Sequence, residues 1–233
     1  TPPAGGPGGR LTALVTADIG SRDVHQEVSE TLAARGPGLA YSRLLRLKTG
    51  PDIVQPSLAL ECELCQDWEI SDPLTYRFHL RDDVRWQDIH PVNGRKLVAE
   101  DVAFSYERQA TEGWPNASLL RSMAGVQAED DVTLRVDLHR HEADFLLALA
   151  DGHSKIVARE VVEGVGGLES GPVVGSGPWR WLKTEWDVGS SFEANPDYFE
   201  RGLPFLERLD FLLIRAPETQ VAAFLTGSLD VYD

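Results

Sequence analysis

The sequence has no long hydrophobic run and no block of basic residues. Its longest apolar stretches, such as residues 145–150 and 211–214, fall far short of the roughly 20 residues that a membrane-spanning helix needs. The 22 Lys and Arg against 37 Asp and Glu give a formal net charge of −15, which repels phosphate backbones and anionic lipid headgroups. These features argue against a transmembrane helix and against binding of nucleic acid or membrane surfaces.

The sequence also lacks a positively charged start followed by an apolar stretch, the pattern of an intact signal peptide. It begins instead with TPPAGGPGG, and we expect residues 1–10 to form a flexible tether. Such a tether suits the mature start of an exported protein, and an expression scar or a domain linker would look the same. The 233 residues, of which 42% are hydrophobic, are enough for one large or two small folded domains.

Cysteine is scarce, and the two cysteines, Cys62 and Cys65, stand together in the motif CELC. A CxxC pair serves as a redox site, as half of a zinc site or as a short-loop disulfide. No second CxxC or HxxxH exists to complete a zinc site. The acidic neighbours Glu61, Glu63 and Asp67 oppose the thiolate that a redox site needs. We therefore predict a structural disulfide or two inert thiols.

Predicted strands and helices alternate along the chain, as in α/β proteins. Apolar residues alternate with polar ones in LTYRFHLR and DVTLRVDL, which predicts half-buried strands. Asp23 and Gln26 have the spacing of a capping box, which predicts a helix that begins at Val24. Pro217 suits a first helical turn, and Gly227 suits the left-handed residue that closes a helix. The predicted strands are 11–16, 74–81, 131–138, 209–214 and a last one beginning at 230–232; the predicted helices are 24–34, 99–109, 144–150 and 217–226.

Three longer stretches carry motifs that occur in a fixed order. They are PSLALECELCQDWEISDPLTYRFHLRDDVRWQDIHPVNGRKLVAEDVAFSYERQ, then GSGPWRW with ANPDYFERGLPFLERLDF, and finally ETQVAAFLTGSLDV. Together the three stretches resemble the family 5 extracellular solute-binding proteins of ABC importers, the peptide/nickel-type receptors. The likeness covers nearly the whole chain, apart from departures such as the segment with the two cysteines. Val98 stands where that family often has Thr or Ser, which should weaken the cap of the following helix by about 1 kcal/mol.

The resemblance implies a mixed-sheet α/β fold of the periplasmic-binding-protein type (class II, family 5) with a small α+β subdomain. Such receptors have two lobes that close on a ligand, and they are about twice as long as this chain. We expect the chain to hold the N-terminal part of such a receptor, with the second lobe absent. In peptide-binding members an acidic group fixes the amino terminus of the peptide, and we expect that group to lie in the absent part. The expected division is 1–10 tether, 11–60 first part of lobe one, 61–170 small subdomain and 171–233 return to lobe one.

No catalytic residue, metal ligand or cofactor site is assigned. Gly175-Ser176-Gly177 lacks the GxSxG pattern of a nucleophile elbow, because Val174 stands two residues before the serine, and a structural turn is favoured. His139 and His141 would share one face of a strand and could bind a metal, but solvated histidines beside Arg140 are favoured.

Ligand contacts are expected in the loops of lobe one and its subdomain. For each position the alternative is a surface loop residue or, for the two aromatic residues, a core position. The candidates are Ser21, Arg22 and Asp23 after the first strand, Tyr41 and Ser42 after the first helix, and Trp114 and Asn116 in the GWPN loop.

The resemblance implies a non-enzymatic, monomeric receptor in the periplasm or on the cell surface, with or without a lipid anchor. The resemblance implies that it captures an oligopeptide-like ligand and works with ABC permease subunits. Two alternatives remain: a metal-chelate receptor of the nickel or heme type on the same fold, and an interaction module or enzyme that has reused the fold. The negative charge favours a cationic or neutral ligand over an anionic one.

Overall fold

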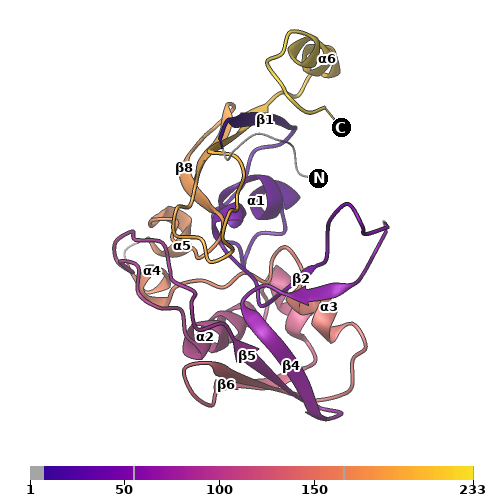
Figure 1. The fold of residues 1–233 in the computed structure, drawn as a ribbon, viewed down its shortest axis with the longest axis vertical. Coiled ribbons are helices and arrows are strands. Elements are labelled where there is room, and N and C mark those ends of the chain that lie inside the picture. The colour runs from indigo at the N-terminus through magenta and orange to yellow at the C-terminus, as the bar shows by residue number, and fades with distance from the viewer. Residues whose placement is uncertain (1–7, 55, 165, 233) are drawn as a thin grey trace.

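The chain forms two four-stranded sheets and one two-stranded sheet (Figure 1). The computed structural model describes residues 8–54, 56–164 and 166–232. The first sheet has the order β1 (Arg10–Val15), β10 (Arg208–Leu213), β9 (Gly189–Ala194), β8 (Trp179–Glu185). The second has the order β4 (Cys65–Asp72), β5 (Thr75–Leu80), β7 (Thr133–Leu138), β6 (Met123–Ala128), and the small sheet pairs β2 (Leu45–Leu47) with β3 (Leu60–Cys62).

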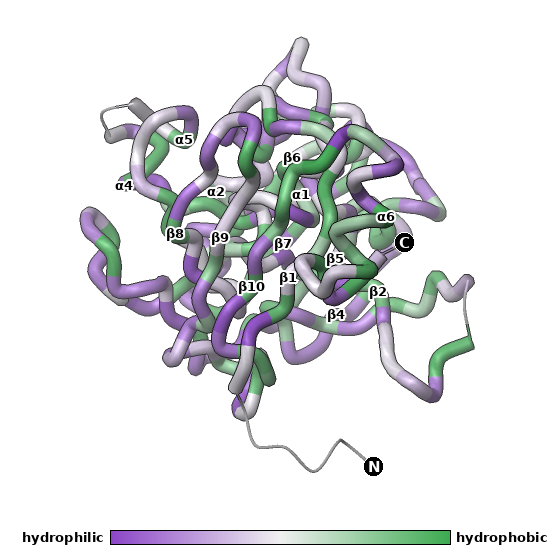
Figure 2. Tube along the Cα trace, turned by 90° about the horizontal axis from the view of Figure 1, so that it is seen from above, coloured by the Kyte–Doolittle hydropathy of each residue, from purple (hydrophilic) through white to green (hydrophobic). Residues whose placement is uncertain are grey.

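The first sheet joins the two ends of the described chain, because β1 pairs in parallel with β10 and the two strands lie side by side (Figure 2). β9 runs antiparallel to both β10 and β8, so that β8 runs in the direction of β1 and β10. Phe192 and Phe211 pack edge to face in its core, with ring centroids 6.1 Å apart. The predicted strands 11–16 and 209–214 are thus confirmed within a residue at each end.

The second sheet confirms the two alternating patterns of the sequence. Tyr76, Phe78 and Leu80 of β5 are buried, and Tyr76 and Phe78 lie opposite Val136 and Leu134 of β7. Helix α2 (Ala99–Gln109), which has the predicted bounds, packs against β6 and β7. Most of the buried apolar residues lie in the core around this helix and sheet.

Helices and 3-10 turns connect the sheets. α3 (Phe145–Leu149) and α6 (Pro217–Leu225) confirm two predicted helices, and Gly227 adopts the left-handed conformation with φ of 73°. Among the helices of the described ranges, none is long and apolar enough to cross a membrane. The remaining elements are α1 (Glu30–Arg35), η1 (Pro37–Ala40), η2 (Pro115–Leu120), α4 (Arg159–Val162) and α5 (Gly167–Ser170).

Two predictions about local structure are wrong. The first helix begins at Glu30 with Ser29 as its cap, not at Val24, because Asp23 instead accepts the His25 N–H in a turn and pairs with a distant arginine. Residues 230–232 form no strand. Of these residues, Asp230 binds the outer edge of β1: its N–H donates to the Thr12 carbonyl at 2.8 Å, and its carboxylate accepts the Thr12 N–H at 2.7 Å.

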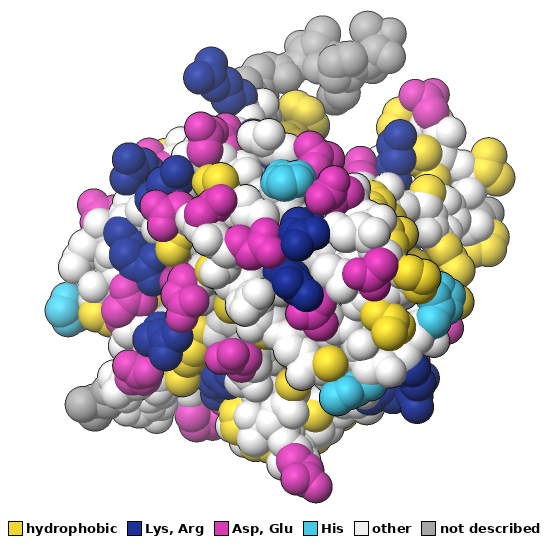
Figure 3. Space-filling view, turned by 90° about the horizontal axis from the view of Figure 1, so that it is seen from below, with side chains coloured by type: hydrophobic (Ala, Val, Ile, Leu, Met, Phe, Trp, Pro, Cys, Tyr) yellow, Lys and Arg dark blue, Asp and Glu magenta, His cyan; other side chains and the backbone are white. Residues whose placement is uncertain are grey.

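Charged side chains of both signs lie beside one another on the face of the molecule seen from below (Figure 3). On the second sheet, Arg77 pairs with Glu129 at 3.0 Å, and Arg135 pairs with Asp137 at the same distance. Exposed pairs of this kind stabilise a fold by less than about 1 kcal/mol each. Each pair places a positive charge beside a negative one on this sheet.

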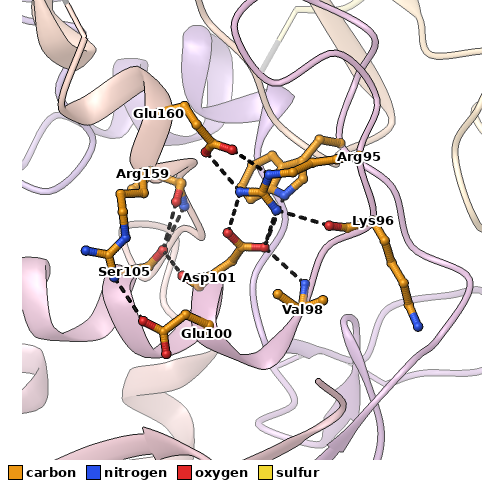
Figure 4. Close-up of polar contacts among 10 residues, drawn as sticks. Arg95, Lys96, Val98, Glu100, Asp101, Ser105, Arg159 and Glu160 are labelled. Carbon is orange, nitrogen blue, oxygen red and sulfur yellow. Dashed lines mark hydrogen bonds and ion pairs between the residues drawn. The ribbon is translucent and has the colours of Figure 1, made fainter. Parts of the chain in front are cut away.

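The start of α2 is held by a network of hydrogen bonds and ion pairs around the buried Asp101 (Figure 4). The Arg95 guanidinium donates to both Asp101 oxygens at 2.7 and 2.8 Å and also pairs with Glu160. Asp101 Oδ2 accepts the Val98 N–H at 3.0 Å, which satisfies the residue before the helix although Val98 has no side-chain acceptor. The hydrogen bond from the main chain of Val98 to the Asp101 side chain is therefore present, whereas the one that a side chain at position 98 would accept from the first helical turn is missing.

Replacing Val98 with threonine should raise the free energy of unfolding by about 0.5–1 kcal/mol. The hydroxyl would accept an N–H of the first helical turn, which the valine side chain cannot do. Urea unfolding of the two proteins measures the difference, and Val98→Ala, which adds no acceptor, should show no gain. A Val98→Thr protein no more stable than the parent would contradict this explanation.

Candidate ligand-facing surface

One edge of the first sheet gathers the carboxyl ends of β1, β10 and β8, because these three strands run in the same direction. In open sheets of α/β proteins, ligands bind outside the carboxyl ends of parallel strands. This edge is therefore the first place to look for a ligand-facing surface.

A hollow of about 270 Å³ opens at this edge, between the end of β1 and helix α1. Arg35 Nη1 donates to the Leu14 carbonyl at 3.0 Å, and its Nη2 lies 3.6 Å from the Glu30 carboxylate. Two hydroxyls, one carboxylate and one guanidinium thus surround a small open space, which suits a polar ligand with groups of both charges. The lining residues are Leu14, Thr16, Glu30, Thr31 and Arg35.

An ion-pair cluster fixes the same edge. Arg215, just after β10, donates to Asp18 after β1 and to Asp187 in the β8–β9 turn, both at 2.6 Å. The Asp187 N–H also donates to Asp18 at 3.2 Å, and Asp187 has a φ of 60°. Three separate chain segments are therefore joined where the strands end.

The predicted residue Asp23 lies behind this edge in a buried ion pair with Arg108 of α2. Arg108 Nη1 lies 3.0 Å from Asp23 Oδ1, and Nη2 lies 2.5 Å from Oδ2. Burial acts to raise the pKa of Asp23, but the hydrogen bonds and charge of Arg108 outweigh it and hold the pKa below its usual value. The side chains are only 6% and 11% exposed, so this pair joins the loop after β1 to α2 within the interior.

His25 is fully buried beside that pair. Its Nδ1 lies 2.9 Å from Arg108 Nη1, and its Nε2 lies 2.8 Å from the carbonyl oxygen of Lys155. Burial is the main reason that the pKa of His25 falls from 6.5 to about 4. Sequence reasoning missed both His25 and Arg108, because the contact joins residues 83 positions apart.

The predicted residues Asn116 and Trp114 reach the same cluster. Asn116 is buried and its Nδ2 donates to the carbonyl oxygens of Val24 and Glu27 at 3.1 and 3.0 Å. The Trp114 ring lies over the Arg108 guanidinium, 4.7 Å from Cζ to the ring centroid. The GWPN loop thus supports the loop after β1, and the Asn116 side chain is committed to that contact.

The other predicted positions lie around this cluster without meeting at one point. Ser21 Oγ and Arg22 Nε both bind Glu169 of α5, the latter at 2.8 Å, and the Arg22 guanidinium lies over Trp181. Tyr41 and Ser42 are buried in the core, at 3% and 0% exposure. Their roles in binding stay predictions, and the hollow at the sheet edge is lined by residues that we did not predict.

The cysteines and the serine motif have structural roles here. Cys62 and Cys65 form a disulfide with Cα atoms 5.0 Å apart. Ser176 is buried at 1% exposure, in a turn packed against η1. Within the described ranges, no group of three or more His, Cys, Asp or Glu side chains is placed to hold a metal ion.

Comparison with known proteins identifies the family. Residues 54–233 match the model described as "Bacterial extracellular solute-binding proteins, family 5 Middle". Heme-binding protein A of Haemophilus influenzae is 28% identical over 214 residues, 82% of this chain and 37% of that protein. Di/tripeptide-binding protein 4 of Pseudomonas aeruginosa is 28% identical over 229 residues, 90% of this chain and 42% of that protein. The chain thus spans about two fifths of the length of these relatives.

Solved structures agree. The periplasmic binding protein DppA from Helicobacter pylori, in complex with the peptide STSA, matches with a TM-score of 0.82 and 26% identity over 96% of this chain and 46% of that one. HbpA2 from Haemophilus parasuis matches with a TM-score of 0.83 and 25% identity over 97% of this chain and 47% of that one. The mixed-sheet fold of the periplasmic-binding-protein type is therefore confirmed. The chain belongs to family 5 of the bacterial extracellular solute-binding proteins.

Proposed function

We propose that this chain forms one wall of the ligand cleft in an exported receptor that captures short peptides and delivers them to an ABC importer. The observation that carries the proposal is the match over nearly the whole chain to relatives named for di- and tripeptides and to a structure holding the peptide STSA. The receptor acts without catalysis and without a cofactor. It works as a monomer in the periplasm or on the cell surface, together with permease subunits.

The side of β1 that faces away from β10 offers main-chain groups to such a ligand. Thr12 already directs its N–H and carbonyl outward to Asp230, and alternate residues of a strand point the same way. Leu14 therefore presents its main-chain groups on the same side, along the hollow, where its carbonyl accepts from Arg35. Main-chain hydrogen bonds with an extended peptide supply affinity that does not depend on its side chains.

The arrangement of the sheets supports a division of the chain into a lobe and a subdomain. Residues 11–60 and 171–233, which contain β1 and β8–β10, form the lobe that carries the hollow. Residues 61–170, with β4–β7 and α2, form the subdomain that supports it through Arg108 and Asn116. A second lobe, closing from the opposite side, completes the cleft.

Isothermal titration of the complete receptor with di-, tri- and tetrapeptides tests this function. We expect reversible binding of one peptide per receptor, and at least a hundredfold weaker binding by the 233-residue chain alone, because one cleft wall is missing. A complete receptor that binds none of these peptides would overturn the peptide assignment. Equal affinities of receptor and chain would overturn the two-wall arrangement.

A heme or metal-chelate ligand is the second candidate, because Heme-binding protein A is among the relatives. Native mass spectrometry of the complete receptor, purified without added ligand, distinguishes the two. A co-purified peptide mass supports the first function. A heme mass, together with a hemin absorbance shift on titration, supports the second.

A further inference from the structure

His25 lies where three parts of the fold meet, and its position is the starting point. It belongs to the loop 16–29, which connects β1 to α1. Its ring touches Arg108 from α2 on one side and the Lys155 main chain on the other, and it is completely buried. The imidazole therefore joins this loop to two segments of the subdomain.

The two ring contacts fix its protonation state. A guanidinium has only N–H donors, so Nδ1 must accept a hydrogen bond from Arg108. A carbonyl oxygen only accepts, so Nε2 must carry the proton that it donates to Lys155. The arrangement needs the neutral ring with its proton on Nε2.

Adding a proton to Nδ1 would set an N–H donor against the Arg108 donor and place a second positive charge beside the guanidinium. Arg108 faces that nitrogen from α2; the Asp23 carboxylate of the same loop favours the imidazolium, but it is paired with Arg108, and burial together with the Arg108 charge outweighs it. No stabilising negative charge comes from the other two neighbours. The Lys155 side chain is buried and basic, and Asn116 of η2 is neutral and bound to main-chain carbonyls. Tyr41 is also close to this ion pair, and burial raises its pKa, which keeps it neutral.

The loop transmits such a change to the hollow, because its two ends are the hollow's walls. Thr16 lies at the start of the loop, and Glu30 and Thr31 lie directly after it. Asn116 and Arg108 hold the middle of the loop at Val24, Glu27 and Asp23. Loss of the His25 contacts would leave α1 tied to this region by fewer bonds.

We propose that His25 is a pH-sensitive latch: in acid the imidazolium separates the loop 16–29 from α2 and the Lys155 segment, and the receptor releases its ligand. The ligand part of this inference rests on the proposed function. The latch itself depends only on the contacts of His25.

The direction of the effect follows from linkage. The pKa of His25 is about 4 when the ring is held and near 6.5 when it is free, so the released loop binds protons more readily. The latch is fully favoured above pH 6.5 and is progressively lost as the pH falls toward 4. Between pH 7.5 and pH 5 the balance shifts toward release by about 30-fold.

The test compares peptide affinity of the complete receptor at pH 7.5 and pH 5.0, with a tetrapeptide that contains no His, Asp or Glu. The parent receptor should bind several-fold more weakly at pH 5.0, up to the limit of about 30-fold that the shift of the latch sets. His25→Gln, whose amide has both an acceptor and a donor but does not titrate in this range, should change less than twofold. His139→Gln, at an exposed site, should behave as the parent does.

Equal affinity of the parent at the two pH values would overturn the latch while leaving peptide binding intact. An equal loss in His25→Gln and the parent would also overturn it. If the parent binds no peptide even at pH 7.5, the proposed function fails, and hydrogen exchange decides on the latch alone. After correction for intrinsic rates, residues 16–29 must lose protection at pH 5.0 in the parent and keep it in His25→Gln; equal protection in both proteins would overturn the latch.

Discussion

Gly175→Ala should destabilise the fold by about 3 kcal/mol or more, because the chain has no room for a β-carbon at this position. The added atom would overlap the carbonyl group of Ala40 and press on the N–H of Tyr41. The obstructing atoms are main chain and cannot rotate away. Gly175 is also fixed from the other side, since its carbonyl accepts the Gln87 N–H at 2.8 Å.

Urea unfolding measures this loss, and Gly125→Ala is the matched control. Gly125 lies in β6 with open space where its β-carbon would stand, so that alanine there should change the free energy of unfolding by less than about 1 kcal/mol. Equal stabilities of Gly175→Ala and Gly125→Ala would show that η1 and the 175–177 turn move apart easily. That result would remove the steric explanation of the GSG motif.

Asp23→Ala should lower the free energy of unfolding by about 3–5 kcal/mol, because it leaves the buried Arg108 guanidinium without its carboxylate. The same change removes the acceptor of the His25 N–H, which holds the turn in the loop after β1. Thermal or urea unfolding at pH 7.5 gives the value.

The control is Asp83→Ala, which removes the partner of Arg81 in a pair of similar geometry on the surface. Arg81 and Asp83 lie 2.9 Å apart, and the Asp83 side chain is 53% exposed, so the expected loss is below 1 kcal/mol. Similar losses for the two variants would mean that the Asp23–Arg108 pair behaves as if it were solvated. The loop after β1 would then need another explanation for its position.

Local patterns could predict the elements whose one-sided burial shows in the spacing of their own residues. The alternation in β5 and β7 and the bounds of α2 follow from burial on one face of each element, and the structure agrees with them. The disulfide was one of two interpretations of a motif whose cysteines are three residues apart. The family resemblance extended these local predictions to the fold as a whole.

The start of α1 shows why other parts could not be predicted. Asp23 and Gln26 do contact each other, at 2.9 Å, as their spacing suggests, but the contact closes a turn and not a helix. The deciding partner of Asp23 is Arg108, 85 positions away, and no periodicity in the sequence reports such a pair. The misplaced start put Glu30 and Thr31 in the middle of a predicted helix, which hid them as candidate site residues.

The ligand-facing hollow was missed for a related reason. Its position depends on the parallel pairing of β1 with β10, which joins Val15 to Leu213 across almost the whole chain. Without that pairing, the carboxyl ends of the strands cannot be placed at a common edge. Predicted loop residues instead identified the support behind the hollow, at Asp23, Trp114 and Asn116.

The Cys62–Cys65 bond also bears on how the chain acquires its fold. It connects the last residue of β3, in the small sheet, to the first residue of β4, in the second large sheet. Because the cysteines are only three residues apart, the cross-link closes a very short loop and removes less disorder from the unfolded chain than a long-range bond would. Its closure needs an oxidant but no tertiary structure. The bond is therefore able to form on a still unfolded chain, at the point where the chain passes from one sheet to the next.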